Sequence, residues 1–120
     1  MAVISFGEGA NQVWNGSGWA VRQVLKDLKP YAAGNSAFLS TLARVEVTEY
    51  FPVCQLGSPL RESVLAAIQQ MCADIIAGTR PSTIEQTLPG DTVAHVVYHK
   101  LIRDLLSLAK AAADDNCQDK

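Results

Sequence analysis

The sequence lacks an excess of charge of either sign. It has 10 Lys and Arg residues against 12 Asp and Glu, for a net charge of -2. Nucleic-acid binding normally needs a basic face that neutralises phosphates. Here only Arg22, Lys26 and Lys29 form a short basic stripe, and Asp27 lies beside them. We therefore do not expect DNA or RNA partners.

Long apolar runs are also missing. No stretch approaches the roughly 20 apolar residues that cross a bilayer, and the first residues have no basic segment typical of a signal peptide. We therefore expect neither a membrane association nor a secretory signal.

Cysteine is scarce, with three residues and no CxxC pair, at Cys54, Cys72 and Cys117. An odd, widely spaced set argues against a disulfide framework or a cysteine zinc site. We expect Cys54 and Cys72 to be small buried apolar side chains. Together with the missing signal, this predicts a cytoplasmic protein.

What the sequence does contain is a globular composition, with 48% hydrophobic and 18% charged residues over 120 positions. This predicts one helical domain over 1–120, with 115–120 as a frayed tail. Hydrophobic spacing and helix caps predict a mainly α domain of four helices with a short N-terminal strand or hairpin. The helices are expected from Ser17 to Lys29, from Ser36 onward, from Ser58 to Gly78 and from Asp91 to Asp114.

The N-terminal residues favour β structure. Residues 2–6 are β-branched and aromatic, 12–14 can form a second strand, and Asn15-Gly16 is typical of a tight turn. Residues 45–51 fit either a continuing helix or a strand. If they form a strand, the alternative fold is α+β, with 2–6 pairing with 45–51.

The third and fourth helices carry apolar faces wider than one partner needs. Residues 58–77 and 91–113 are expected to pack side by side, and the surplus is covered either by the other helices or by another chain. One side of the last helix is expected to consist of Val93, Val96, Val97, Leu101, Leu105, Leu108 and Ala112, and the apolar surface is widened by Ala94, Tyr98, Ile102 and Leu106. A homodimer and a monomer both remain open.

His95 and His99 form the most specific chemical pattern. Side chains four residues apart on a helix lie one turn above each other, a spacing that suits two ligands of one zinc ion. No Glu follows His95 as in an HExxH motif, and a third ligand would have to come from Asp91, Asp74, Glu62 or Cys72. The alternative is a pair of partly exposed histidines that cap a surface or hydrogen-bond to the third helix.

Three aromatic residues are candidates for contact with a partner. Trp14 and Trp19 flank the Asn15-Gly16 dipeptide, and Tyr31 follows a proline. Tryptophan and tyrosine are enriched in binding hot spots. They fit the end of a hydrophobic core equally well.

These patterns leave three classes of function. The first is a small soluble, non-enzymatic protein of the immunity, antitoxin, adaptor or regulator type, acting through contacts with another protein or with itself. The second is a metal-binding helical protein using His95 and His99. The third is a small oligomeric enzyme with its site between subunits. No catalytic residues and no cofactor other than zinc emerge from the sequence, and we favour the first class.

Overall fold

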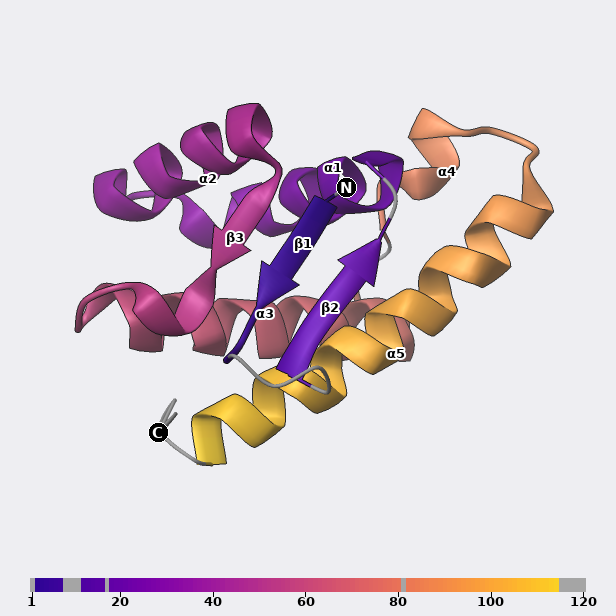
Figure 1. The fold of residues 1–120 in the computed structure, drawn as a ribbon. Coiled ribbons are helices and arrows are strands. Elements are labelled where there is room, and N and C mark those ends of the chain that lie inside the picture. Colours follow the sequence, from indigo (N-terminus) through magenta and orange to yellow (C-terminus); the bar gives the residue numbers. More distant parts are fainter. Residues whose placement is uncertain (1, 8–11, 17, 81, 115–120) are drawn as a thin grey trace.

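Helices form most of the molecule, and a small sheet lies at its N-terminal end (Figure 1). The computed structural model describes residues 2–7, 12–16, 18–80 and 82–114. The strands are β1 (Ala2–Ser5), β2 (Val13–Gly16) and β3 (Tyr50–Pro52). The α-helices are α1 (Gly18–Leu28), α2 (Ser36–Thr48), α3 (Leu60–Ala77), α4 (Ile84–Thr87) and α5 (Thr92–Asp114), and two 3-10 helices are η2 (Lys29–Ala32) and η3 (Val53–Gln55). A mainly α domain with N-terminal strands is therefore confirmed.

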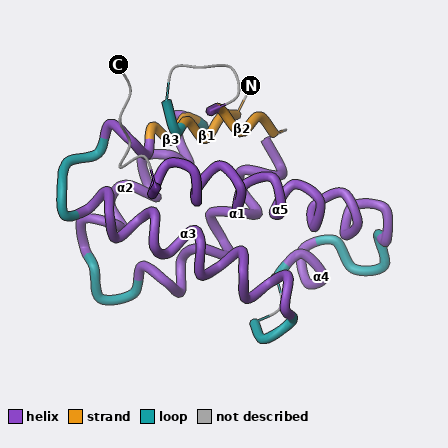
Figure 2. Tube along the Cα trace, turned by 90° about the horizontal axis from the view of Figure 1, so that it is seen from below, coloured by secondary structure: helices purple, strands orange, loops and turns teal. Residues whose placement is uncertain are grey.

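The sheet has the order β2-β1-β3, and helices cover one of its faces (Figure 2). β1 pairs with β2 in antiparallel and with β3 in parallel orientation. The expected turn at Asn15-Gly16 was wrong, because Asn15 pairs with Val3 and Gly16 with Ala2 inside the ladder. The chain has already reversed before β2, where the Phe6 amide donates to the Gln12 carbonyl at 2.8 Å.

Residues 45–51 combine both alternatives. α2 continues to Thr48 and ends at Glu49, which has a φ of 60° and donates its amide to the Val45 carbonyl. The strand that follows covers only 50–52, so the expected pairing of β1 with 45–51 is limited to residues 50 and 51 and extends to Pro52. α2 begins at Ser36 as expected, but the residue before it provides the cap. Asn35 caps α2 because its side chain reaches the Phe38 amide at 3.1 Å.

The two long helices confirm the expected packing. α3 and α5 share the most extensive contact of any two elements. α3 ends at Gly78, whose left-handed φ of 79° closes the helix. α5 starts after Asp91, which accepts a hydrogen bond from the Ala94 amide at 3.0 Å. α4 is a single helical turn that follows Ser82 and Thr83.

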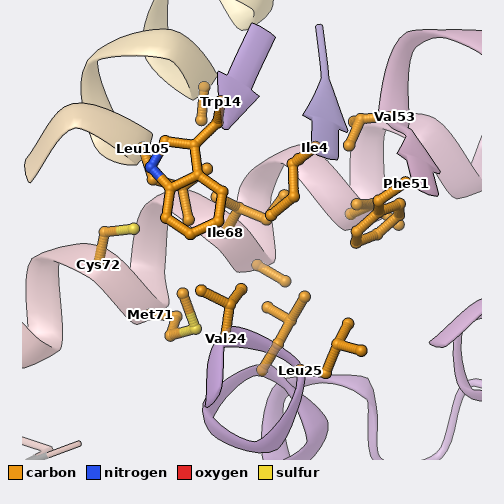
Figure 3. Close-up of a cluster of buried hydrophobic side chains, with 14 of the residues drawn as sticks. Ile4, Trp14, Val24, Leu25, Phe51, Val53, Ile68, Met71, Cys72 and Leu105 are labelled. Atoms are coloured by element: carbon orange, nitrogen blue, oxygen red, sulfur yellow. The ribbon is translucent and has the colours of Figure 1, made fainter. Parts of the chain in front are cut away.

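The core lies between the sheet and the helices (Figure 3). Ile4, Trp14 and Phe51 of the strands meet side chains of α1, α3 and α5. The buried helix residues drawn there include Val24, Leu25, Ile68, Met71, Cys72 and Leu105. The buried residues of the strands and helices thus form one continuous core.

Helix α5 is only partly covered by this core. Its buried residues are Tyr98, Ile102, Leu105, Ala109 and Ala112. The wide apolar face expected for α5 is therefore split, because its first three valines are exposed. None of the helices in the described part of the chain combines the length and apolar character needed to span a membrane.

Candidate functional site

A buried carboxylate, Asp27, is the most highly coordinated polar group among the described residues. Its Oδ2 accepts hydrogen bonds from Ser82 Oγ at 2.6 Å and Tyr98 OH at 2.8 Å. Its Oδ1 accepts from the backbone amide and the hydroxyl of Thr83, both at 2.8 Å. Buried carboxylates need such donors to replace lost water. Asp27 thus joins α1, the segment before α4, and α5.

This cluster changes the acidity of its neighbours. Burial, and then the Asp27 charge, raise the pKa of the Tyr98 hydroxyl well above its usual value. Burial, and then the Asp27 charge, raise the pKa of the Cys72 thiol to about 12. Both groups are therefore protonated at neutral pH, and Cys72 has no nucleophilic thiolate there.

A small cavity opens beside this cluster, with a volume of about 50 Å³. Its lining residues are Asp27, Pro30, Tyr31, Met71, Ile75, Arg80 and Thr83. Pockets that bind drug-sized ligands measure roughly 300–1,000 Å³. The cavity is far smaller than such pockets. We call the hydrogen-bonded Asp27 cluster a clamp, because its bonds tie three segments of the chain together.

Polar contacts join the side chains at the edge of this cavity. Tyr31 OH donates to Asp74 Oδ2 at 2.7 Å, and the Arg80 guanidinium lies 5.0 Å from the centre of the Tyr31 ring. The hydrogen bond from Tyr31 lowers the pKa of Asp74, whereas burial, followed by the bond to Asp74, raises the pKa of Tyr31. Tyr31, a candidate contact residue, is thus half-buried and tied to α3.

In contrast to the buried Asp27 cluster, part of α5 presents apolar and basic side chains to solvent. Val93 and Val96 are 72% and 71% exposed, and Val97 is 42% exposed. Their spacing places them together on the helix, next to Lys100 and Arg103. Neither basic residue forms an ion pair with any group in the described ranges. We call these five residues the α5 face.

An open groove of about 560 Å³ runs along this helix. It is lined by His95, Val96, His99, Lys100 and Arg103. All of its lining side chains come from one helix, and none is a carboxylate. The groove is therefore a basic surface next to exposed apolar side chains, which suits an acidic and apolar polypeptide surface.

The structure brings the two histidines to the same groove, as their spacing predicted. His95 Nε2 lies 2.9 Å from the Leu88 carbonyl oxygen, so this nitrogen is engaged within the fold. Among the residues that the structure describes, no three His, Cys, Asp or Glu side chains are close enough to share a metal ion. Zinc binding by His95 and His99 stays a prediction without a third ligand.

The tryptophans belong to the interior more than to a contact surface. Trp14 is buried, and its indole Nε1 donates to the Leu101 carbonyl at 2.9 Å, which anchors β2 to α5. The surface-contact role proposed for Trp14 is therefore wrong, because its ring fills the core. Trp19 is partly buried, with its ring 6.3 Å from that of Tyr98.

The cysteines also differ from expectation. Cys72 is free and buried as predicted, but Cys54 is half-buried and disulfide-bonded. The third cysteine, Cys117, lies outside the described residues. Since disulfides persist mainly in oxidising compartments, the cysteines no longer favour a reducing cytoplasm.

Two features of the site were missed from the sequence. From the sequence, Asp27 was noted only as a neighbour of basic residues. It also lies next to the apolar stripe of its helix, and a carboxylate in such a place is seldom buried without hydrogen-bond partners. The three valines of α5 were assigned to its apolar side, but neither their exposure nor the neighbouring Lys100 and Arg103 was recognised. In comparisons with known proteins, no family model matches the chain, and neither a curated protein nor a solved structure matches it at a significant level.

Proposed function

We propose that this protein acts by binding another polypeptide through the α5 face, as an adaptor, immunity, antitoxin or regulator type of protein. The observation that carries the proposal is the exposure of Val93 and Val96, both above 70%, beside the cations Lys100 and Arg103, which form no ion pair with the described residues. Contiguous apolar surface rimmed by polar groups is typical of interaction sites.

The chemistry of this surface defines its partner. A complementary surface offers apolar side chains to the valines and carboxylates to Lys100 and Arg103. Complementary charge speeds encounter and orients the two surfaces, while burial of the valines contributes affinity. By contrast, the 50 Å³ cavity beside Asp27 supports no substrate site.

Site-specific photocross-linking tests the proposal. A benzophenone amino acid replaces Val96 in the full chain, expressed in the cells that naturally make the protein. The matched control carries the same group at Val47, an equally accessible valine on α2 with 84% exposure. We expect one discrete protein adduct from position 96 and a much weaker one from position 47.

A second substitution separates specific docking from random capture. Arg103→Glu in the position-96 chain reverses one charge of the α5 face and is expected to lower the adduct yield several-fold. Equal yields from positions 96 and 47, or a yield that ignores Arg103→Glu, would contradict the proposal.

A further inference from the structure

The solvent side of α5 carries a longer pattern than the three valines. Exposed residues recur along this helix at alternating spacings of four and three, which is the heptad spacing of helices that pair with each other. The positions of this heptad seam are Val93, Val97, Lys100, Asp104, Ser107 and Ala111. α5 is also the outermost helix along one side of the molecule in Figure 1, so a second helix can approach it.

The seam is complementary to itself in one orientation only. In a parallel pair, Lys100 would face Lys100 and Asp104 would face Asp104, which is repulsive. A two-fold axis midway between Lys100 and Asp104 runs the helices antiparallel and places each Lys100 opposite the partner's Asp104. The same axis places Val97 opposite the partner's Ser107 and Val93 opposite the partner's Ala111.

This arrangement matches size as well as charge. The large residues of the seam lie in the N-terminal half of α5, and the small ones lie in its C-terminal half. Antiparallel pairing puts each valine against a small side chain, which lets the helices approach closely. Neither Lys100 nor Asp104 forms an ion pair within the described chain, so both remain available.

We propose that the polypeptide bound by α5 is a second copy of this chain, in an antiparallel homodimer along the heptad seam. The inference rests on the proposed function, because the seam shares Val93, Val97 and Lys100 with the α5 face. A single helix face provides less area than the roughly 800 Å² per partner of a standard interface, so we expect association at micromolar concentration.

Charge reversal with rescue tests the geometry in the full, oxidised chain. Lys100→Glu and Asp104→Lys each place like charges opposite one another and are expected to weaken self-association about tenfold or more. Mixing the two variants restores both attractive pairs in a heterodimer. Lys110→Glu is the matched control, since it makes the same charge change on an exposed position of α5 outside the seam.

Sedimentation velocity measures the outcome from about 10 μM to about 1 mM, with circular dichroism confirming that each variant is folded. The wild type and Lys110→Glu are expected to reach twice the 12.9 kDa mass of the chain. Each single seam variant is expected to need about tenfold higher concentration for the same dimer fraction, and the mixture of the two is expected to dimerise at the wild-type concentration. A monomeric wild type, seam variants that dimerise as tightly as the wild type, or a mixture that fails to recover would each overturn the dimer.

The sedimentation experiment and the cross-linking experiment distinguish failure of the homodimer from failure of the proposed function. If the wild type is monomeric but position 96 still cross-links to a different protein, the homodimer is wrong and the proposed function stands. If position 96 gives no adduct and the chain is monomeric, the proposed function is wrong as well.

Discussion

Single residues determine how the helices are held, and Tyr98 is the clearest case. Its hydroxyl donates to the buried Asp27 at 2.8 Å. Tyr98→Phe keeps the ring and removes this bond to a charged group, so we expect the free energy of unfolding to fall by about 2 kcal/mol at pH 7. Urea denaturation followed by circular dichroism measures the change. Tyr50→Phe, at an exposed ring on β3, is the matched control and is expected to change little.

The difference in stability between wild type and Tyr98→Phe has a defined pH dependence. The pKa of Tyr98 in the folded protein is raised well above 10, so the folded state retains this proton more strongly than the unfolded state. The resulting stabilisation is fully present below pH 10 and is lost as the pH rises above that value. The stability gap between wild type and Tyr98→Phe should therefore narrow above pH 10. A gap that stays constant, or that is absent at pH 7, would show that the phenol does not hold Asp27.

At the scale of the element, helix ends depend on particular backbone conformations. Gly78 ends α3 with a φ of 79°, and an added Cβ there meets no atom within 4 Å. Gly78→Ala is therefore expected to cost about 1 kcal/mol through backbone strain alone. Gly57→Ala also points into open space but without a left-handed φ, so we expect a change below about 0.5 kcal/mol. Equal midpoints of urea unfolding for the two variants would refute this assignment.

Elements were predictable where local chemistry decides them. The caps Asp91 and Gly78 bounded their helices correctly because capping needs only a few neighbouring residues. Asn15-Gly16 misled because its strand conformation is imposed by pairing with β1. Asn35 took the capping role from Ser36 because its side chain reaches the Phe38 amide. The first error arises because strand pairing overrides a local turn preference, and the second arises because two neighbouring residues compete for one cap.

At the scale of the whole molecule, the sequence could not show contacts between residues that are far apart along the chain. The donors to Asp27 at Ser82 and Tyr98 lie 55 and 71 residues away from it. Similarly, the apolar spacing of α5 placed Val93 and Val96 on its apolar side, and only the packing of the chain leaves these two residues uncovered. The fold class was therefore accessible from periodicity, whereas the clamp and the α5 face required the tertiary structure.

The free thiol of Cys72 reports on the integrity of the whole fold. It is fully buried, and burial, followed by the Asp27 charge, raises its pKa to about 12. Since alkylation requires both access and a thiolate, we expect iodoacetamide to modify Cys72 only in unfolded molecules.

Pulsed labelling of the unreduced protein across a urea series measures this, with peptide mass spectrometry identifying the modified site. Half-modification of Cys72 should coincide with the midpoint seen by tryptophan fluorescence, because Trp14 lies in the same core. Cys72→Ala is the control, in which this labelling transition disappears while the fluorescence transition remains. Modification of Cys72 at urea concentrations well below the fluorescence midpoint would mean that α3 opens separately from the rest of the molecule, contrary to one continuous core.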